Sequence, residues 1–139
     1  MASAGLLVLA LACAWLLLGL RYGADYKRFA SQSAEYYARL AESCEALLHQ
    51  NPAPFPGLSP DPEQPGWFRL PSGAALPASI KELSPDIVRV STNSAYLGFR
   101  RTATFDWGIV WFQHEDKTNS WTLESVGAGE RVLYVKNSE

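Results

Sequence analysis

Reactive side chains are scarce in this chain of 139 residues, which contains two cysteines and two histidines. Cys13 lies in an apolar run, so we expect no bridge to Cys44 and no disulfide framework. The sequence has no Gly-x-Ser-x-Gly elbow, phosphate loop or dinucleotide fingerprint. We therefore expect no cofactor, and we interpret Cys44 as a small apolar core residue rather than a nucleophile.

The chain also lacks an excess of positive charge. Twelve Lys and Arg stand against fourteen Asp and Glu, which gives a net charge of −2. Nucleic-acid binding needs clustered cations, and Arg100 and Arg101 form the only basic pair outside the stretch that follows the amino-terminal run. We expect no nucleic-acid partner.

Residues 4–20, in contrast, contain no charged side chain. As a helix, this run is about 26 Å long, close to the roughly 30 Å of a bilayer's hydrocarbon core. Only a helix satisfies its own backbone in lipid, so the run predicts a single-pass membrane anchor over residues 1–24, with membrane lipid as a partner. The anchoring side chains are Leu6, Leu7, Leu9, Leu11, Trp15, Leu16, Leu17, Leu18 and Leu20.

Two alternatives to a retained anchor are open. A cleaved signal peptide needs a small-x-small cleavage site, and the large Tyr22 fits such a site poorly. A lipoprotein site at Cys13 would leave much of the apolar run beyond the modified residue. The side of the membrane is also open: Arg21, Lys27 and Arg28 follow the run and slightly favour a cytoplasmic domain.

Residues 25–139 are predicted to form one domain that begins with a helix over residues 25–50. This segment has neither Pro nor Gly, and its apolar positions recur at spacings of three and four. Gly19 and Gly23 are the only weak points before it, so it and the anchor could form one rod. We expect the helix to pack on a sheet, with a coiled coil as the alternative. The expected stripe is Tyr26, Phe29, Ala30, Ser33, Tyr36, Tyr37, Leu40, Ala41, Cys44, Leu47 and Leu48.

All nine prolines lie within residues 51–85, which predicts an extended connector. Phe55, Trp67 and Phe68 are expected either to hold the connector to the domain or to contact a partner. A proline-rich ligand at residues 52–56 is the more specific alternative. One or two helical turns are expected over residues 77–83, with Ile80 and Leu83 facing inward.

Residues 86–139 change to the pattern of strands. Strands are expected over residues 87–91, 95–101, 105–113, 120–126 and 131–136. Because the connections are short, an antiparallel meander is expected. The predicted fold is α+β: an amino-terminal transmembrane helix runs into an amphipathic helix packed on a sheet of about four or five strands.

Three groups of side chains are candidates for chemistry or binding. Asp106, His114 and Glu115 are the residues that a small membrane-tethered enzyme would use. Asp116 adds a third ligand type beside His114 and Glu115, but adjacent strand residues point to opposite faces, so no metal site is expected. The third group consists of aromatic residues that form either a binding platform or, as we expect, a core: Trp107, Trp111 and Trp121.

The order of elements is similar to the layout of type IV pilins and pseudopilins. The motif of those families, a cleavage Gly followed by Phe-Thr-Leu and a Glu, is absent, and residues 1–20 contain no acidic residue. We expect a non-enzymatic, membrane-anchored module that acts by binding or assembly, with a protein partner or self-association. A small membrane-tethered enzyme is the alternative.

Overall fold

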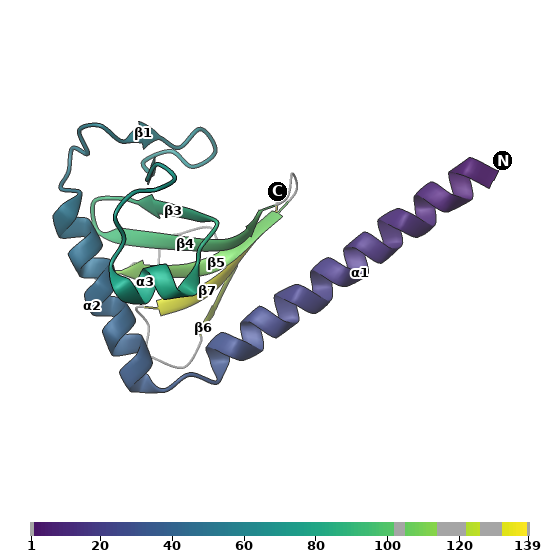
Figure 1. Cartoon of the computed structure of the whole chain (residues 1–139), viewed down its shortest axis with the longest axis horizontal. Coiled ribbons are helices and arrows are strands. Elements are labelled where there is room, and N and C mark those ends of the chain that lie inside the picture. Colours follow the sequence, from purple (N-terminus) through teal and green to yellow (C-terminus); the bar gives the residue numbers. More distant parts are fainter. Residues whose placement is uncertain (1, 102–104, 114–121, 126–131, 139) are drawn as a thin grey trace.

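The computed structural model describes residues 2–101, 105–113, 122–125 and 132–138. Helix α1 (Ala2–Ala30) projects from a compact head, and helices α2 (Ala34–Gln50) and α3 (Ala78–Leu83) cover one face of an antiparallel sheet, as Figure 1 shows. The predicted α+β class is confirmed. One helix in the described chain, Ala4–Ala30, is long and apolar enough to cross a membrane, although a signal sequence has the same properties.

The expected single helix over residues 25–50 is wrong, because the chain turns a corner at residues 31–33. The Ser33 hydroxyl accepts a hydrogen bond from the backbone N–H of Tyr36 at 3.2 Å and so caps the start of α2. The Tyr37 hydroxyl donates to the carbonyl of Phe29 in the last turn of α1. The two glycines considered as weak points, Gly19 and Gly23, lie within α1.

In the part of the chain that the structure describes, seven strands form the sheet in the order β1-β2-β3-β4-β5-β7-β6. The five expected strands are present as β3 (Ile87–Val90), β4 (Ser94–Arg101), β5 (Phe105–Phe112), β6 (Thr122–Ser125) and β7 (Val132–Ser138). The expected meander holds through β5, but β7 then lies between β5 and β6. Strand β6 thus pairs with β7 and forms one edge of the sheet.

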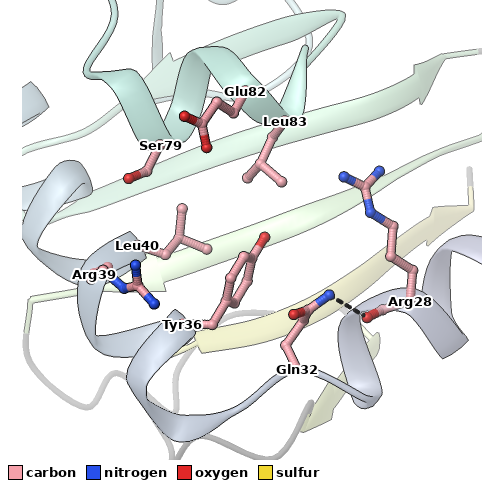
Figure 2. Close-up of a pocket in the computed structure, with 8 residues that line it drawn as sticks. All are labelled: Arg28, Gln32, Tyr36, Arg39, Leu40, Ser79, Glu82 and Leu83. Atoms are coloured by element: carbon pink, nitrogen blue, oxygen red, sulfur yellow. Dashed lines mark hydrogen bonds between the residues drawn. The ribbon is translucent and has the colours of Figure 1, made fainter.

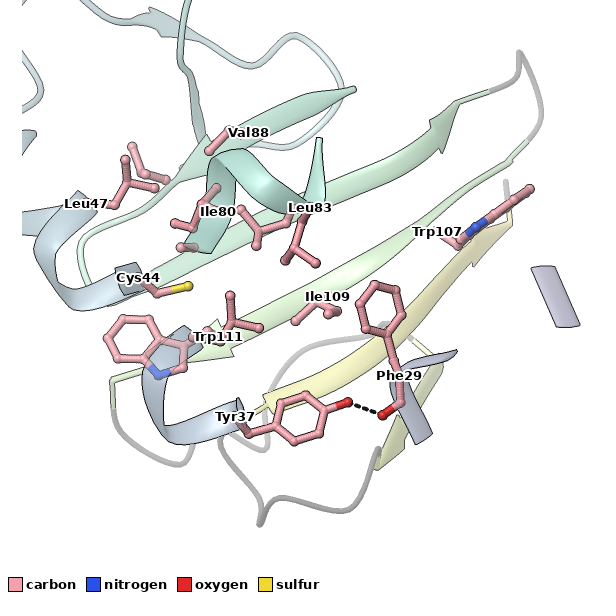
Figure 3. Packing of buried hydrophobic residues seen from close by; sticks show 14 of the residues in the cluster. Phe29, Tyr37, Cys44, Leu47, Ile80, Leu83, Val88, Trp107, Ile109 and Trp111 are labelled. Carbon is pink, nitrogen blue, oxygen red and sulfur yellow. Dashed lines mark hydrogen bonds between the residues drawn. The ribbon is translucent and has the colours of Figure 1, made fainter. Parts of the chain in front are cut away.

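The main core lies between the helices and the sheet. Four of the predicted stripe residues on α2 are buried: Tyr37, Leu40, Cys44 and Leu47. Ile109 and Trp111 of β5 lie on the same side of the sheet as these residues, and Trp107 lies at the other end of β5, toward α1, as Figure 3 shows. Burying an aromatic or aliphatic side chain contributes about 1.5–3 kcal/mol, so this face supplies much of the stability of the small head. The expectation that Trp107 and Trp111 belong to a core is confirmed.

The proline-rich connector adds two strands that the sequence did not predict, β1 (Ser59–Pro60) and β2 (Phe68–Arg69). Strand β2 pairs with β3. Trp67 and Phe68, which are adjacent in the sequence, lie on opposite faces of the sheet. Phe68 packs against the main core, and its ring lies 4.7 Å from that of Phe55. Trp67 joins a second cluster on the opposite face with Tyr96, Val110 and Phe112. The expected turns over residues 77–83 are confirmed as α3, with Ile80 and Leu83 buried.

Candidate functional site

The apolar run and the core of the head belong to the same helix. The large apolar side chains of the run are 54–68 % exposed, from Leu6 through Leu20, with Leu18 as the exception. Leu18 is partly buried against the main core, together with Tyr22 and Tyr26 of the next turns, and Phe29 is fully buried. The last three turns of α1 therefore pack on the head, while the preceding turns offer apolar surface to the surroundings.

A polar contact fixes this junction. The buried indole Nε1 of Trp107 donates a hydrogen bond to the Asp25 Oδ2 at 2.8 Å. The Trp107 ring also meets the Tyr22 ring edge-on, with centroids 5.9 Å apart. Farther along α1, the Phe29 ring lies 5.0 Å from that of Phe99 in β4. A hydrogen bond to a charged group contributes about 1.5–3 kcal/mol, so this contact stabilises the packing of α1 on the sheet.

A cavity of about 190 Å³, lined by both polar and apolar side chains, lies where the end of α1 meets α2 and α3 (Figure 2). Arg28 and Arg39 supply two positive charges to its wall, and Glu82 of α3 supplies one negative charge. Burial raises the pKa of Tyr36, which also lines the cavity. Arg39 is already paired with the exposed Glu35 at 3.4 Å. The lining is completed by Gln32, Leu40, Ser79 and Leu83.

A buried ionic cluster ties the connector to the sheet. Asp61 Oδ2 accepts hydrogen bonds at 2.6 Å from the Nε atoms of both Arg69 and Arg89. Its Oδ1 accepts from the backbone N–H groups of Glu63 at 2.8 Å and Gln64 at 3.1 Å. Burial alone would raise the pKa of Asp61, but these hydrogen bonds and the two guanidinium groups lower it to about 2. The cluster is a structural clamp, because both carboxylate oxygens are already bonded within the protein.

The residues predicted for partner contact have little surface to offer. Phe55 and Trp67 are buried, and Phe68 is half-buried. These three side chains hold the connector against the head, and their contact with a partner stays a prediction.

The alternative of a small membrane-tethered enzyme depends on Asp106, His114 and Glu115. The side chain of Asp106 lies outside the described residues, as do His114, Glu115, Asp116 and Trp121. Within the described ranges, no group of three His, Cys, Asp or Glu side chains could hold a metal ion.

Sequence reasoning missed both polar contacts that organise the head. Arg89 gave a signal, because it is the one charged residue in the strand Ile87–Val90 and a buried strand position demands a partner for it. Asp25 gave a weaker signal, as a lone acidic residue between Arg21 and Lys27. Neither signal names the partner, since Asp61 and Trp107 are distant in the sequence.

Comparison with known proteins identifies no relative. No protein-family model, curated protein or solved structure matches this chain.

Proposed function

We propose that this protein is a single-pass, membrane-anchored module that acts by binding or assembly rather than by catalysis. One observation carries the proposal: the last three turns of the apolar helix are packed into the core of the head. If α1 only tethered an enzyme to the membrane, a flexible linker between α1 and the head would serve equally well. A helix locked to the sheet by the Trp107–Asp25 hydrogen bond instead sets the orientation of the head relative to the bilayer.

The same observation supports a retained helix over a cleaved signal. Cleavage near Ala24 would remove Leu18 and Tyr22, both of which pack against the main core. It would also take away the ring that covers the edge of Trp107. Signal peptides are removed from the mature protein and so are not expected to form part of its core.

A fixed orientation matters when surfaces on the head must meet a partner that is itself held at the membrane. Such a partner, or a second copy of this chain, would find the outer surfaces of the head at a constant height and angle. Binding costs less entropy when the binding surface is ordered beforehand, so a rigid junction favours association in the membrane plane.

The test is alkaline carbonate extraction of membranes from cells that make the protein at native level, followed by cross-linking in detergent. We expect the full-length chain to stay in the membrane pellet and to be recovered cross-linked to a partner or to itself. A chain released by carbonate would refute the anchoring part of the proposal. A chain that stays in the pellet but is recovered only as an unlinked monomer would refute the binding part.

A further inference from the structure

The direction of β4 relative to α1 decides which part of the head faces the membrane. Phe99 of β4 meets Phe29 near the end of α1, with centroids 5.0 Å apart. One residue later, Arg100 is paired in register with Trp107, which meets Tyr22 at 5.9 Å. The Tyr22 contact belongs to Trp107 of the neighbouring β5, and it lies about two turns before the Phe29 contact on α1; in Figure 1, the end of β4 likewise lies on the side of the apolar part of α1. Strand β4 therefore runs toward the apolar part of the helix.

This end of the sheet reaches the end of the apolar run. Leu18 is partly buried against the main core, whereas Leu17 and Leu20 are each 62 % exposed. In Figure 1, the end of β4 and the start of β5 lie together at the end of the sheet away from α2, and the register places Ser138 at the end of β7 beside Phe105. If residues 4–20 lie in lipid, this end of the sheet is at the membrane surface.

Basic residues are concentrated at this end. The register aligns Arg100 with Trp107 and Lys136, and in the next row Arg101 with Asp106 and Asn137. Arg21 of α1, one position before Tyr22, is exposed. Among the described residues at this level, the acidic ones are Asp25, Asp86 and Asp106; Asp25 accepts the hydrogen bond of Trp107, and the backbone N–H of Asp86 donates to the carbonyl of Gly98 near the end of β4. Positive charge is in excess here: Arg21, Arg100, Arg101 and Lys136.

We propose that this end of the sheet docks on the bilayer that holds α1 and binds the headgroups of anionic phospholipids. The inference rests on the proposed anchoring role. Basic residues close to a membrane are attracted to its anionic lipids, and the long side chains of Arg and Lys suit the headgroup region. The bilayer is the surface nearest to these residues, because the junction at Tyr22 and Trp107 holds them beside the apolar run. Docking would fix the head against the membrane by a second contact besides α1.

The test places a fluorophore at the end of β7 by the substitution S138C in a C13A background. The full-length protein is reconstituted into liposomes of phosphatidylcholine alone or with phosphatidylserine, each with a spin-labelled headgroup as quencher. We expect stronger quenching with phosphatidylserine, and weaker quenching as salt rises from 0.1 to 0.5 M, because salt screens exposed charges. R100Q/R101Q should lower the docking equilibrium constant by roughly 25-fold, about fivefold per charge.

The matched control is R39Q/K81Q, which removes the same charge from exposed positions on α2 and α3. We expect it to dock as the wild type does. Equal quenching in both lipids, or R100Q/R101Q docking as the wild type does, would overturn the inference. If R100Q/R101Q fails to fold, the salt titration of the wild type decides, and quenching that is insensitive to salt overturns the inference. A chain extracted by carbonate would instead refute the anchoring proposal, and the inference with it.

Discussion

At the scale of single residues, Asp61 is the group on which the packing of the connector depends. Its carboxylate is buried with the guanidinium of Arg89, whose side chain is 2 % exposed. Removing one partner of a buried ion pair leaves an uncompensated charge and costs about 3–5 kcal/mol. We therefore expect Asp61→Asn to lower the free energy of unfolding by that amount. Denaturant unfolding in detergent, followed by tryptophan fluorescence, measures the change.

A control substitution and the dependence of stability on pH distinguish this cluster from ordinary surface charge. Glu35→Gln breaks an exposed pair with Arg39, so a loss of less than about 0.5 kcal/mol is expected. The pKa of Asp61 is lowered from 3.8 to about 2, so the folded state binds its proton less readily than the unfolded state. The stability that Asp61 contributes is complete above about pH 4 and is lost as the pH falls toward 2. The proposed clamp is wrong if Asp61→Asn costs no more than Glu35→Gln.

Cys44 offers a second prediction at this scale. It is fully buried on the face of α2 that packs on the sheet, and burial raises the pKa of its thiol to about 12. Since the thiolate is the reactive form, we expect no reaction with a maleimide at pH 8 in a folded C13A variant, and full reaction after denaturation. Mass spectrometry counts the adducts. Rapid labelling of the folded protein would contradict the burial of this thiol.

The burial of Cys44 could be predicted from the sequence, whereas the burial of Asp61 could not, and the reason is physical. The position of Cys44 follows from a helical period of three and four residues, which is local information. Asp61 lies between Pro60 and Pro62 and resembles any solvated turn residue. Its burial depends on Arg89 in another strand, and no local pattern encodes that pairing.

At the scale of elements, the corner between α1 and α2 is the feature that the apolar spacing of the sequence did not predict. The apolar spacing continues across residues 31–33, so the periodicity alone indicated one helix. The break depends on local hydrogen bonding, in which the Ser33 hydroxyl caps α2 and the Tyr37 hydroxyl bonds back to the carbonyl of Phe29. Serine competes with the helix for backbone hydrogen bonds, and this was the available signal.

The cap can be tested directly. Ser33→Ala removes the acceptor for the Tyr36 N–H, so a loss of about 1 kcal/mol in the free energy of unfolding is expected. Ser33→Asn keeps an acceptor and should remain within a few tenths of a kcal/mol of the wild type. Chemical denaturation of the three proteins in one detergent gives the comparison. Equal losses in both variants would show that the hydroxyl is not a cap.

The order of the last strands was predicted wrongly for a different reason. The pairing expected between the last two strands is present, because β6 and β7 are antiparallel neighbours. The sequence could not show that this pair adds to β5 through its second strand, because both β6 and β7 carry patterns compatible with a sheet. Which strand becomes the neighbour of β5 depends on side-chain fit across the whole face of the sheet.

At the scale of the whole molecule, the charge distribution relates the fold to the side of the membrane. Arg21 follows the apolar run directly, and the sheet adds Arg100, Arg101 and Lys136 at the same end of the head, whereas Lys27 and Arg28 lie in the last turn of α1. Anionic lipids are enriched in the cytoplasmic leaflet. The docking inference and the positive-inside rule therefore favour the same orientation, with the head in the cytoplasm. This orientation stays a prediction.

Two truncations separate the part of α1 that holds the membrane from the part that belongs to the head. Deletion of residues 2–17 removes most of the exposed apolar surface and keeps Leu18, Tyr22 and Asp25, so the head should stay folded and leave the membrane pellet. Deletion of residues 2–24 also removes Leu18 and Tyr22 from the core. Loss of these two contacts should lower the free energy of unfolding by about 2–4 kcal/mol relative to the shorter deletion, because each side chain is partly buried. Fractionation and thermal unfolding check both expectations. Equal stability of the two truncated proteins would mean that residues 18–24 do not stabilise the head. The rigid junction between α1 and the sheet, on which the proposed function depends, would then be refuted.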